Sequence, residues 1–180
     1  MCAVKFAYIG NDINDLKVHE IVEKSYSPET EIKQFSSDLY KKNDVLKEIA
    51  TVCALNNKSG IMYVDGQYTK LGESTEAALK VFAEKLGRYD TKLGKIDYTK
   101  EPEAYSKFLG QQVKKVATLD FTSERKLMST VVTGFDGTGN STLIKGAPER
   151  VIAKCQTYKN SNGQISNLIQ RDKDNLIEKV

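Results

Sequence analysis

The residues best suited to chemistry lie on two short segments of the second half of the chain. Phe121 lies within residues 119–126 (LDFTSERK), and Lys145 begins residues 145–149 (KGAPE). An aromatic ring can stack on a nucleotide base, which contributes roughly 1–3 kcal/mol, and a lysine can meet a phosphate as a point charge. Glycine at position 146 lets a ligand approach the backbone closely. Together the two segments predict a nucleotide site.

Each of these residues also has a simpler structural explanation. Phe121 would share a strand face with Ala117 and Leu119, and apolar strand residues usually face a core. Lys126 could be a solvated lysine. Arg125 could reach a phosphate with its planar fork of donors, or it could pair with a neighbouring carboxylate. Met128 could form an apolar wall for a purine or lie in the core.

A third segment, residues 72–79 (GESTEAAL), carries a carboxylate that suits the same ligand. Glu76 can accept hydrogen bonds from the amino group that distinguishes adenine at that edge of the base. Thr75 and Glu76 could equally be the capping residue and first-turn acid of a helix. The two roles are compatible.

Taken together, these segments resemble the nucleotide-binding domain of P-type cation pumps, and most closely the calcium pumps of the sarco/endoplasmic reticulum type. The resemblance is specific across residues 51–57, 72–79, 118–132 and 143–155. It implies that Phe121 stacks on adenine and that Glu76 accepts the adenine amino protons. It further implies that Lys126 lines the nucleotide pocket, that Lys145 lies deep in the adenine pocket, and that Gly146 and Ala147 form the adjoining wall. Thr75, Arg125 and Met128 are further candidates for the ATP site because of their own chemistry.

The sequence departs from this family at one position and lacks the reactive motif. Ser123 stands where the calcium pumps commonly carry an arginine that approaches the phosphates, so Arg125 or Lys126 substitutes or the phosphate contact is weaker. The DKTGT aspartate that accepts the γ-phosphate is absent. The resemblance therefore implies a domain that binds ATP but hydrolyses nothing alone, with Mg²⁺ held by the phosphorylation domain of a parent pump.

The resemblance also implies a context for this domain. Its partners would be the phosphorylation and actuator domains of a parent calcium transporter, at the cytosolic face of the endoplasmic reticulum. We expect residues 1–180 to be one nucleotide-binding domain that stops before the family's last strand. Two alternatives stay open: a pump for another cation, of the sodium/potassium or proton type, and a stand-alone ATP-sensing or interaction module.

Composition narrows the classes of function. The 27 basic and 24 acidic residues are interspersed and leave a net charge of only +3, which argues against a general nucleic-acid binder. Three widely spaced cysteines and a single histidine, His19, argue against a zinc site and for a reducing compartment. No apolar run approaches the roughly 20 residues that a membrane helix needs.

Hydrophobic periodicity predicts an α+β fold with an antiparallel sheet flanked by helices. In the first half we expect a strand near residues 1–9, a loop or variable insertion over 11–34, and a helix capped by Asn43 or Asp44. An Asp-Gly hairpin over 61–70 should follow. The strongest helix prediction is 72–87, capped by Ser74 or Thr75 and closed by Gly87.

The second half predicts the sheet that carries the site. Strands are expected at 116–121, 127–135 and 141–145, with a glycine-rich break at 136–140. Residues 105–115 are ambiguous. Pro148 should begin a helix that runs to about Cys155, residues 160–163 should form a turn, and Asp172 should cap a last helix that reaches residue 180.

Overall fold

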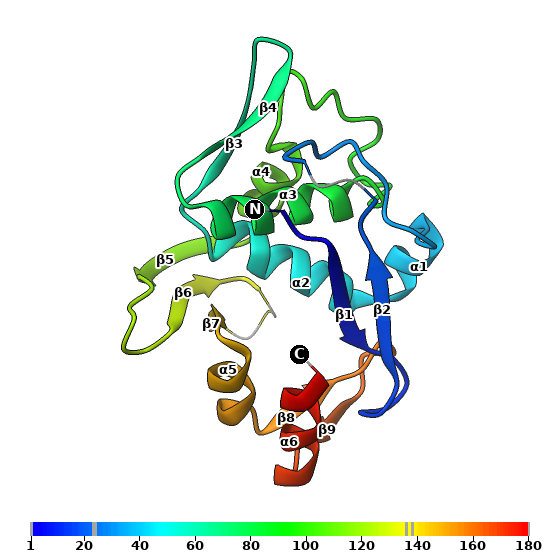
Figure 1. Cartoon of the computed structure of the whole chain (residues 1–180), viewed down its shortest axis with the longest axis vertical. Coiled ribbons are helices and arrows are strands. Elements are labelled where there is room, and N and C mark those ends of the chain that lie inside the picture. The colour runs from blue at the N-terminus through cyan, green and yellow to red at the C-terminus, as the bar shows by residue number, and fades with distance from the viewer. Residues whose placement is uncertain (1, 23–24, 136, 138, 180) are drawn as a thin grey trace.

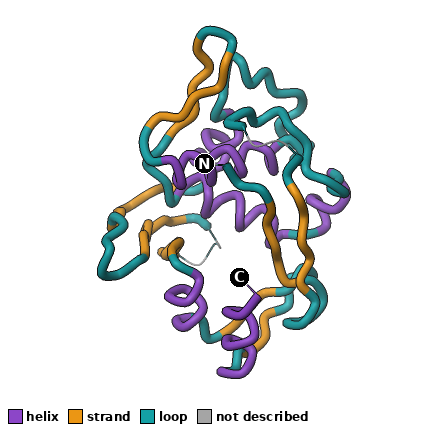
Figure 2. Tube along the Cα trace, viewed as in Figure 1, coloured by secondary structure: helices purple, strands orange, loops and turns teal. Residues whose placement is uncertain are grey.

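Three helices lie across the middle of the structure and supply most of its core (Figure 1). They are α2 (Asp44–Leu55), α3 (Ser74–Gly87) and α4 (Ala104–Gln112), preceded by the short α1 (Ser37–Lys42). The computed structural model describes residues 2–22, 25–135, 137 and 139–179. In that part of the chain the strands form four small antiparallel sheets, three with two strands and one with three (Figure 2). The predicted α+β class is confirmed, but its strands are divided among separate sheets.

Helix α2 forms where the sequence predicts it. The side chain of Asn43 accepts a hydrogen bond from the backbone N–H of Val45 at 3.2 Å, which satisfies one of the free donors at the helix start. Apolar residues three and four positions apart then share one face, and Leu46, Ala50 and Cys53 on that face are buried. Buried side chains of α3 and α4, among them Phe82, Leu86 and Leu109, belong to the same cluster.

Helix α3 covers nearly the predicted residues, but other residues and contacts determine where it begins and ends. Its N-cap is Glu73, without a side-chain capping bond, so the predicted cap at Ser74 or Thr75 is wrong. The Ser59 hydroxyl donates to the Glu73 carbonyl at 3.2 Å, and this long-range contact fixes the helix start. Gly87 does not close the helix in a left-handed conformation. It is the last helical residue, and a Cβ there would overlap the ring of Tyr105.

Helix α4 occupies most of the segment whose sequence was ambiguous. No local side chain caps its start. Instead the buried carboxylate of Glu84 on α3 accepts hydrogen bonds from the backbone N–H groups of Tyr105 and Ser106, both at 2.8 Å. The Ser106 hydroxyl donates to it at 2.6 Å. A distant helix therefore supplies the cap that the local sequence lacks.

Two hairpins flank the helices. Strands β3 (Gly60–Val64) and β4 (Gln67–Leu71) form the predicted hairpin, which projects at the top of Figure 1. Its turn residues Asp65 and Gly66 both have positive φ, at 51° and 79°. The prediction of a loop over 11–34 is wrong in part, because β1 (Lys5–Ile9) pairs with β2 (Leu16–Glu20). The alternating residues of this second strand form a ladder that only tertiary pairing reveals.

The three-stranded sheet consists of β5 (Lys114–Leu119), β6 (Leu127–Thr133) and β7 (Asn140–Gly146). Its central strand is mostly buried, but every residue of β5 is exposed. The alternative that placed Ala117, Leu119 and Phe121 on a core face is therefore wrong, because all three residues are exposed. Phe121 lies in the loop after β5. Positions 136 and 138 of the predicted break lie outside the described residues.

The last part of the chain forms two helices and a small hairpin at the bottom of Figure 1. Pro148 occupies the first turn of α5 (Pro148–Lys154), as predicted. Strands β8 (Thr157–Lys159) and β9 (Ile165–Asn167) enclose the predicted turn. Asp172 lies inside the first turn of α6 (Gln170–Lys179), so it is not the cap, and the predicted end at residue 180 lies outside the described residues. Among the described helices, none has the length and apolar character that crossing a membrane requires.

Candidate nucleotide-binding site

A cavity of about 930 Å³ lies where the ends of several elements meet. Its lining comes from the last turns of α2, the first turns of α3, the loop after β5, the end of β7 and helix α5. This volume is within the range of about 300–1,000 Å³ that small-molecule sites occupy. The cavity brings together most of the residues that the sequence singled out: Thr75, Glu76, Phe121, Met128, Lys145, Gly146 and Ala147.

Glu76 and Lys145 form an ion pair inside this cavity. The Lys145 Nζ lies 2.6 Å from the Glu76 Oε1, and the two side chains are only 17% and 18% exposed. The second carboxylate oxygen, Oε2, accepts a hydrogen bond from the backbone N–H of Lys58 at 3.1 Å. Two donors therefore fix the orientation of the carboxylate, which offers a hydrogen-bond acceptor to the cavity.

An exposed ring and an apolar floor complete the cavity. Phe121 is 57% exposed although it is a large apolar side chain, so it is available to a ligand. Met128, in contrast to Phe121, is almost completely buried, with 2% of its surface exposed. It pairs in register with Lys145 across β6 and β7, so the thioether and the ammonium stem lie side by side on one face of the sheet.

Gly146 is required where β7 ends beside the start of β6. A Cβ at this position would overlap the carbonyl oxygen of Lys126. The same carbonyl accepts a hydrogen bond from the backbone N–H of Ala147 at 3.1 Å. Close approach of two backbone segments therefore explains the glycine and sets the direction in which the chain enters α5.

Arg125 and Lys126 do not line the cavity. The Arg125 guanidinium donates to the backbone carbonyl of Asp120, and the Lys126 Nζ lies 3.9 Å from a carboxylate oxygen of Glu149. Lys126 has a positive φ of 54° and is the last residue of the loop between β5 and β6. Their roles toward a nucleotide stay predictions.

A family model described as P-type ATPase, cytoplasmic domain N, matches residues 45–180. This range covers most of the chain and every element that lines the cavity. The chain belongs to the P-type ATPase cytoplasmic N domain family. That domain is the nucleotide-binding part of a P-type ATPase, which agrees with the resemblance recognised in the sequence. Strands β1 and β2 and helix α1 lie before the matched residues.

Two buried asparagines of this N domain that position the site were not predicted. The side chain of Asn56 donates to the carbonyls of Met128 and Leu143 at 3.1 and 3.2 Å, and it accepts from the Thr130 hydroxyl at 2.9 Å. Asn57 donates to the carbonyl of Glu76 at 2.7 Å. These buried asparagines join the end of α2 to the sheet and to α3. The resemblance over residues 51–57 marked the segment but gave no role.

Burial and neighbouring charges shape the electrostatics of the N domain cavity. Burial raises the pKa of the Cys53 thiol to about 12, so this lining residue is an uncharged apolar surface at neutral pH. Partial burial lowers the pKa of Lys115, and the ammonium groups of Lys80 and Lys145 act in the same direction. The Lys115 Nζ donates to the backbone carbonyl of Asn57 at 3.3 Å. The ammonium groups of Lys80, Lys115 and Lys145 thus lie close enough to influence one another, although Lys145 is itself paired with Glu76.

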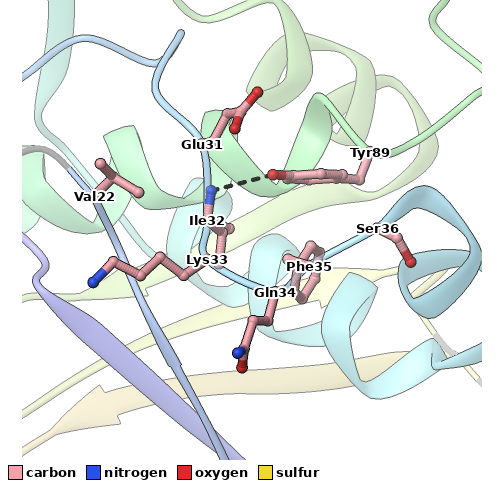
Figure 3. A pocket seen from close by; sticks show the side chains of 8 residues that line it. All are labelled: Val22, Glu31, Ile32, Lys33, Gln34, Phe35, Ser36 and Tyr89. Atoms are coloured by element: carbon pink, nitrogen blue, oxygen red, sulfur yellow. Dashed lines mark hydrogen bonds between the residues drawn. The ribbon is translucent and has the colours of Figure 1, made fainter.

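A second cavity, of about 510 Å³, lies beside residues 31–36 (Figure 3). Tyr89 accepts a hydrogen bond from the backbone N–H of Ile32 at 3.2 Å. Its lysine, Lys33, is paired with Glu20 at 2.6 Å. None of the residues predicted for nucleotide binding lines it, and we assign it no ligand. Among the described residues, no cluster of His, Cys, Asp and Glu side chains could hold a metal ion.

Proposed function

We propose that this N domain binds ATP by its adenine end, with Phe121 stacked on the base and Glu76 accepting from the adenine amino group. The observation that carries the proposal is that the exposed Phe121 ring and the Glu76–Lys145 pair line the same cavity. A ring supplies stacking for any base, whereas a fixed carboxylate favours a base that offers donors at that edge. Cys53 and Met128 give the apolar surface that a purine requires.

The proposal extends to the parent protein, a P-type calcium-transporting ATPase of the endoplasmic reticulum membrane with this domain at its cytosolic face. There the domain would present the γ-phosphate to an aspartate of the phosphorylation domain, which also supplies the Mg²⁺ ligands. The contribution of this domain is positioning, which lowers the entropic part of the barrier. The given sequence has no DKTGT aspartate to accept the γ-phosphate, so we expect this domain by itself to hydrolyse no ATP.

The calcium assignment rests on the likeness of residues 121–129 (FTSERKLMS) to the calcium pumps. It is tested by ATP-dependent ion uptake into vesicles that contain the parent pump. Uptake of calcium supports the assignment, and uptake of sodium, potassium or protons instead contradicts it.

Nucleotide binding is tested by calorimetric titration of the 180-residue chain with ATP, AMP, adenosine and GTP. We expect the adenine ligands to bind with Kd values of about 1 mM, which corresponds to about −4 kcal/mol. GTP should bind more weakly, because its ring oxygen faces the Glu76 carboxylate. Equal binding of GTP and ATP would contradict the role of Glu76, and no heat from any adenine ligand would contradict the proposal itself.

A further inference from the structure

The inner part of the cavity contains one cation whose charge is already compensated. Among the described residues that line the cavity, the basic side chains are Lys58 and Lys145. Lys145 is largely buried and paired with Glu76 at 2.6 Å. A base that occupies the apolar floor near Met128 would direct its sugar and phosphates outward, away from this pair. The phosphates would then need a second cation on the solvent side of the cavity, which we call the mouth.

Lys58 provides a cation at the mouth. Its side chain is 56% exposed, and its Nζ lies 2.5 Å from the Oδ1 of Asp120, which is 61% exposed. Asp120 immediately precedes Phe121 and also lines the cavity. This exposed ion pair therefore joins the segment after α2 to the loop after β5 on the solvent side of the cavity, next in sequence to the proposed stacking ring.

The backbone around Lys58 is held firmly although its side chain is exposed. The N–H of Lys58 donates to the Glu76 carboxylate, and the N–H of Ser59 donates to the buried side chain of Asn57 at 2.8 Å. A ligand that contacts Glu76 thus lies close to the Lys58 backbone. The Lys58 side chain can therefore leave Asp120 for another partner while the Lys58 backbone stays in place.

The other basic residues near Phe121, which are Arg125 and Lys126, do not line the cavity. Arg125 donates to the backbone carbonyl of Asp120, and Lys126 lies nearest to Glu149. Ser123 carries no charge and is not among the lining residues. Of these residues and Lys58, Lys58 is therefore the cation best placed to contact phosphates at the mouth.

We propose that Lys58 binds the phosphates of ATP and that Asp120 competes with the phosphates for its ammonium group. This inference rests on the proposed function. An exposed pair of single charges contributes little to stability, so its exchange for a phosphate costs little. The phosphates of ATP carry more negative charge than one carboxylate. Their oxygens accept strong charge-assisted hydrogen bonds from an ammonium group. Asp120 would also repel the phosphates directly, because like charges lie close at the mouth.

The test measures Kd for ATP and for adenosine with three variants, by calorimetry at low salt. Lys58→Gln removes the cation, and we expect it to weaken ATP binding about 5-fold, the value of one exposed charge pair. Asp120→Asn removes the competitor, and we expect it to strengthen ATP binding by about 2- to 5-fold on the same basis. Adenosine binding should stay unchanged in both. Lys107→Gln is the matched control, because its ion pair with Glu101 is equally exposed and does not line the cavity.

The outcomes separate the two proposals. Adenosine and ATP both failing to bind the unsubstituted chain would overturn the proposed function. Normal adenosine binding with an unchanged ATP affinity in Lys58→Gln would overturn only the role of Lys58. Equal weakening of adenosine and ATP in that variant would show that Lys58 shapes the pocket rather than meeting phosphates, which also overturns the inference. Weaker ATP binding in Lys58→Gln and stronger ATP binding in Asp120→Asn, with adenosine binding unchanged in both, would establish the inference.

Discussion

The substitution Phe121→Ala separates a ligand-binding ring from a structural one. Stacking of a base on an aromatic ring contributes roughly 1–3 kcal/mol, so its loss should weaken ATP binding about 5- to 150-fold. Adenosine should lose the same factor, because the ring meets the base and not the phosphates. Fluorescence competition or calorimetry over a range of ligand concentrations measures both values.

The fold should tolerate this substitution. Full burial of a phenylalanine contributes about 1.5–3 kcal/mol, and Phe121 is 57% exposed, so its truncation should cost about 1 kcal/mol or less in unfolding free energy. Leu119→Ala is the matched control: Leu119 is 55% exposed on β5 and does not line the cavity. Unchanged adenosine affinity in Phe121→Ala, or a loss of stability typical of a core residue, would refute the reasoning.

Three further predictions concern the framework and the carboxylate of the site. Burial raises the pKa of Glu84 to about 7 from an ordinary 4.5, so stability is lost as pH rises through this window, by up to about 3 kcal/mol. Denaturant unfolding at pH 5 and pH 8 should show this loss, and Glu84→Gln should lack it; a parallel loss in both chains would contradict the assignment. Gly87→Ala should destabilise by about 1–3 kcal/mol through overlap with Tyr105, whereas Gly110→Ala, whose Cβ would lie 3.8 Å from its nearest neighbour, should not; equal melting temperatures would contradict this. Glu76→Gln should reduce the preference for ATP over GTP, and an unchanged preference in competition binding would exclude Glu76 from base recognition.

Local chemistry was sufficient to predict the elements that depend on it. Asn43 caps α2 from the adjacent position, and Asp65 and Gly66 adopt the positive φ angles that their hairpin requires. Pro148 begins α5 for the same kind of reason. In each case the deciding interaction lies within a few residues of sequence.

Features that depend on distant contacts were missed. The start of α4 depends on Glu84, about twenty positions earlier. Asn56 joins the sheet through bonds to residues more than seventy positions away. The site prediction relied on family resemblance, which identified the lining residues near Lys145 but not the ion pair at the mouth.

The central claim is that adenine occupies the cavity beside Phe121, and an amide-shift NMR titration with adenosine and ATP tests it most directly. We expect both ligands to shift signals of residues that line the cavity, above all Glu76, Phe121 and Gly146, with a common pattern from the base. Signals of β1 and of the β3–β4 hairpin should stay in place. Shifts elsewhere, or no shifts up to about 10 mM ligand, well above the concentration at which a millimolar site fills, would contradict the account.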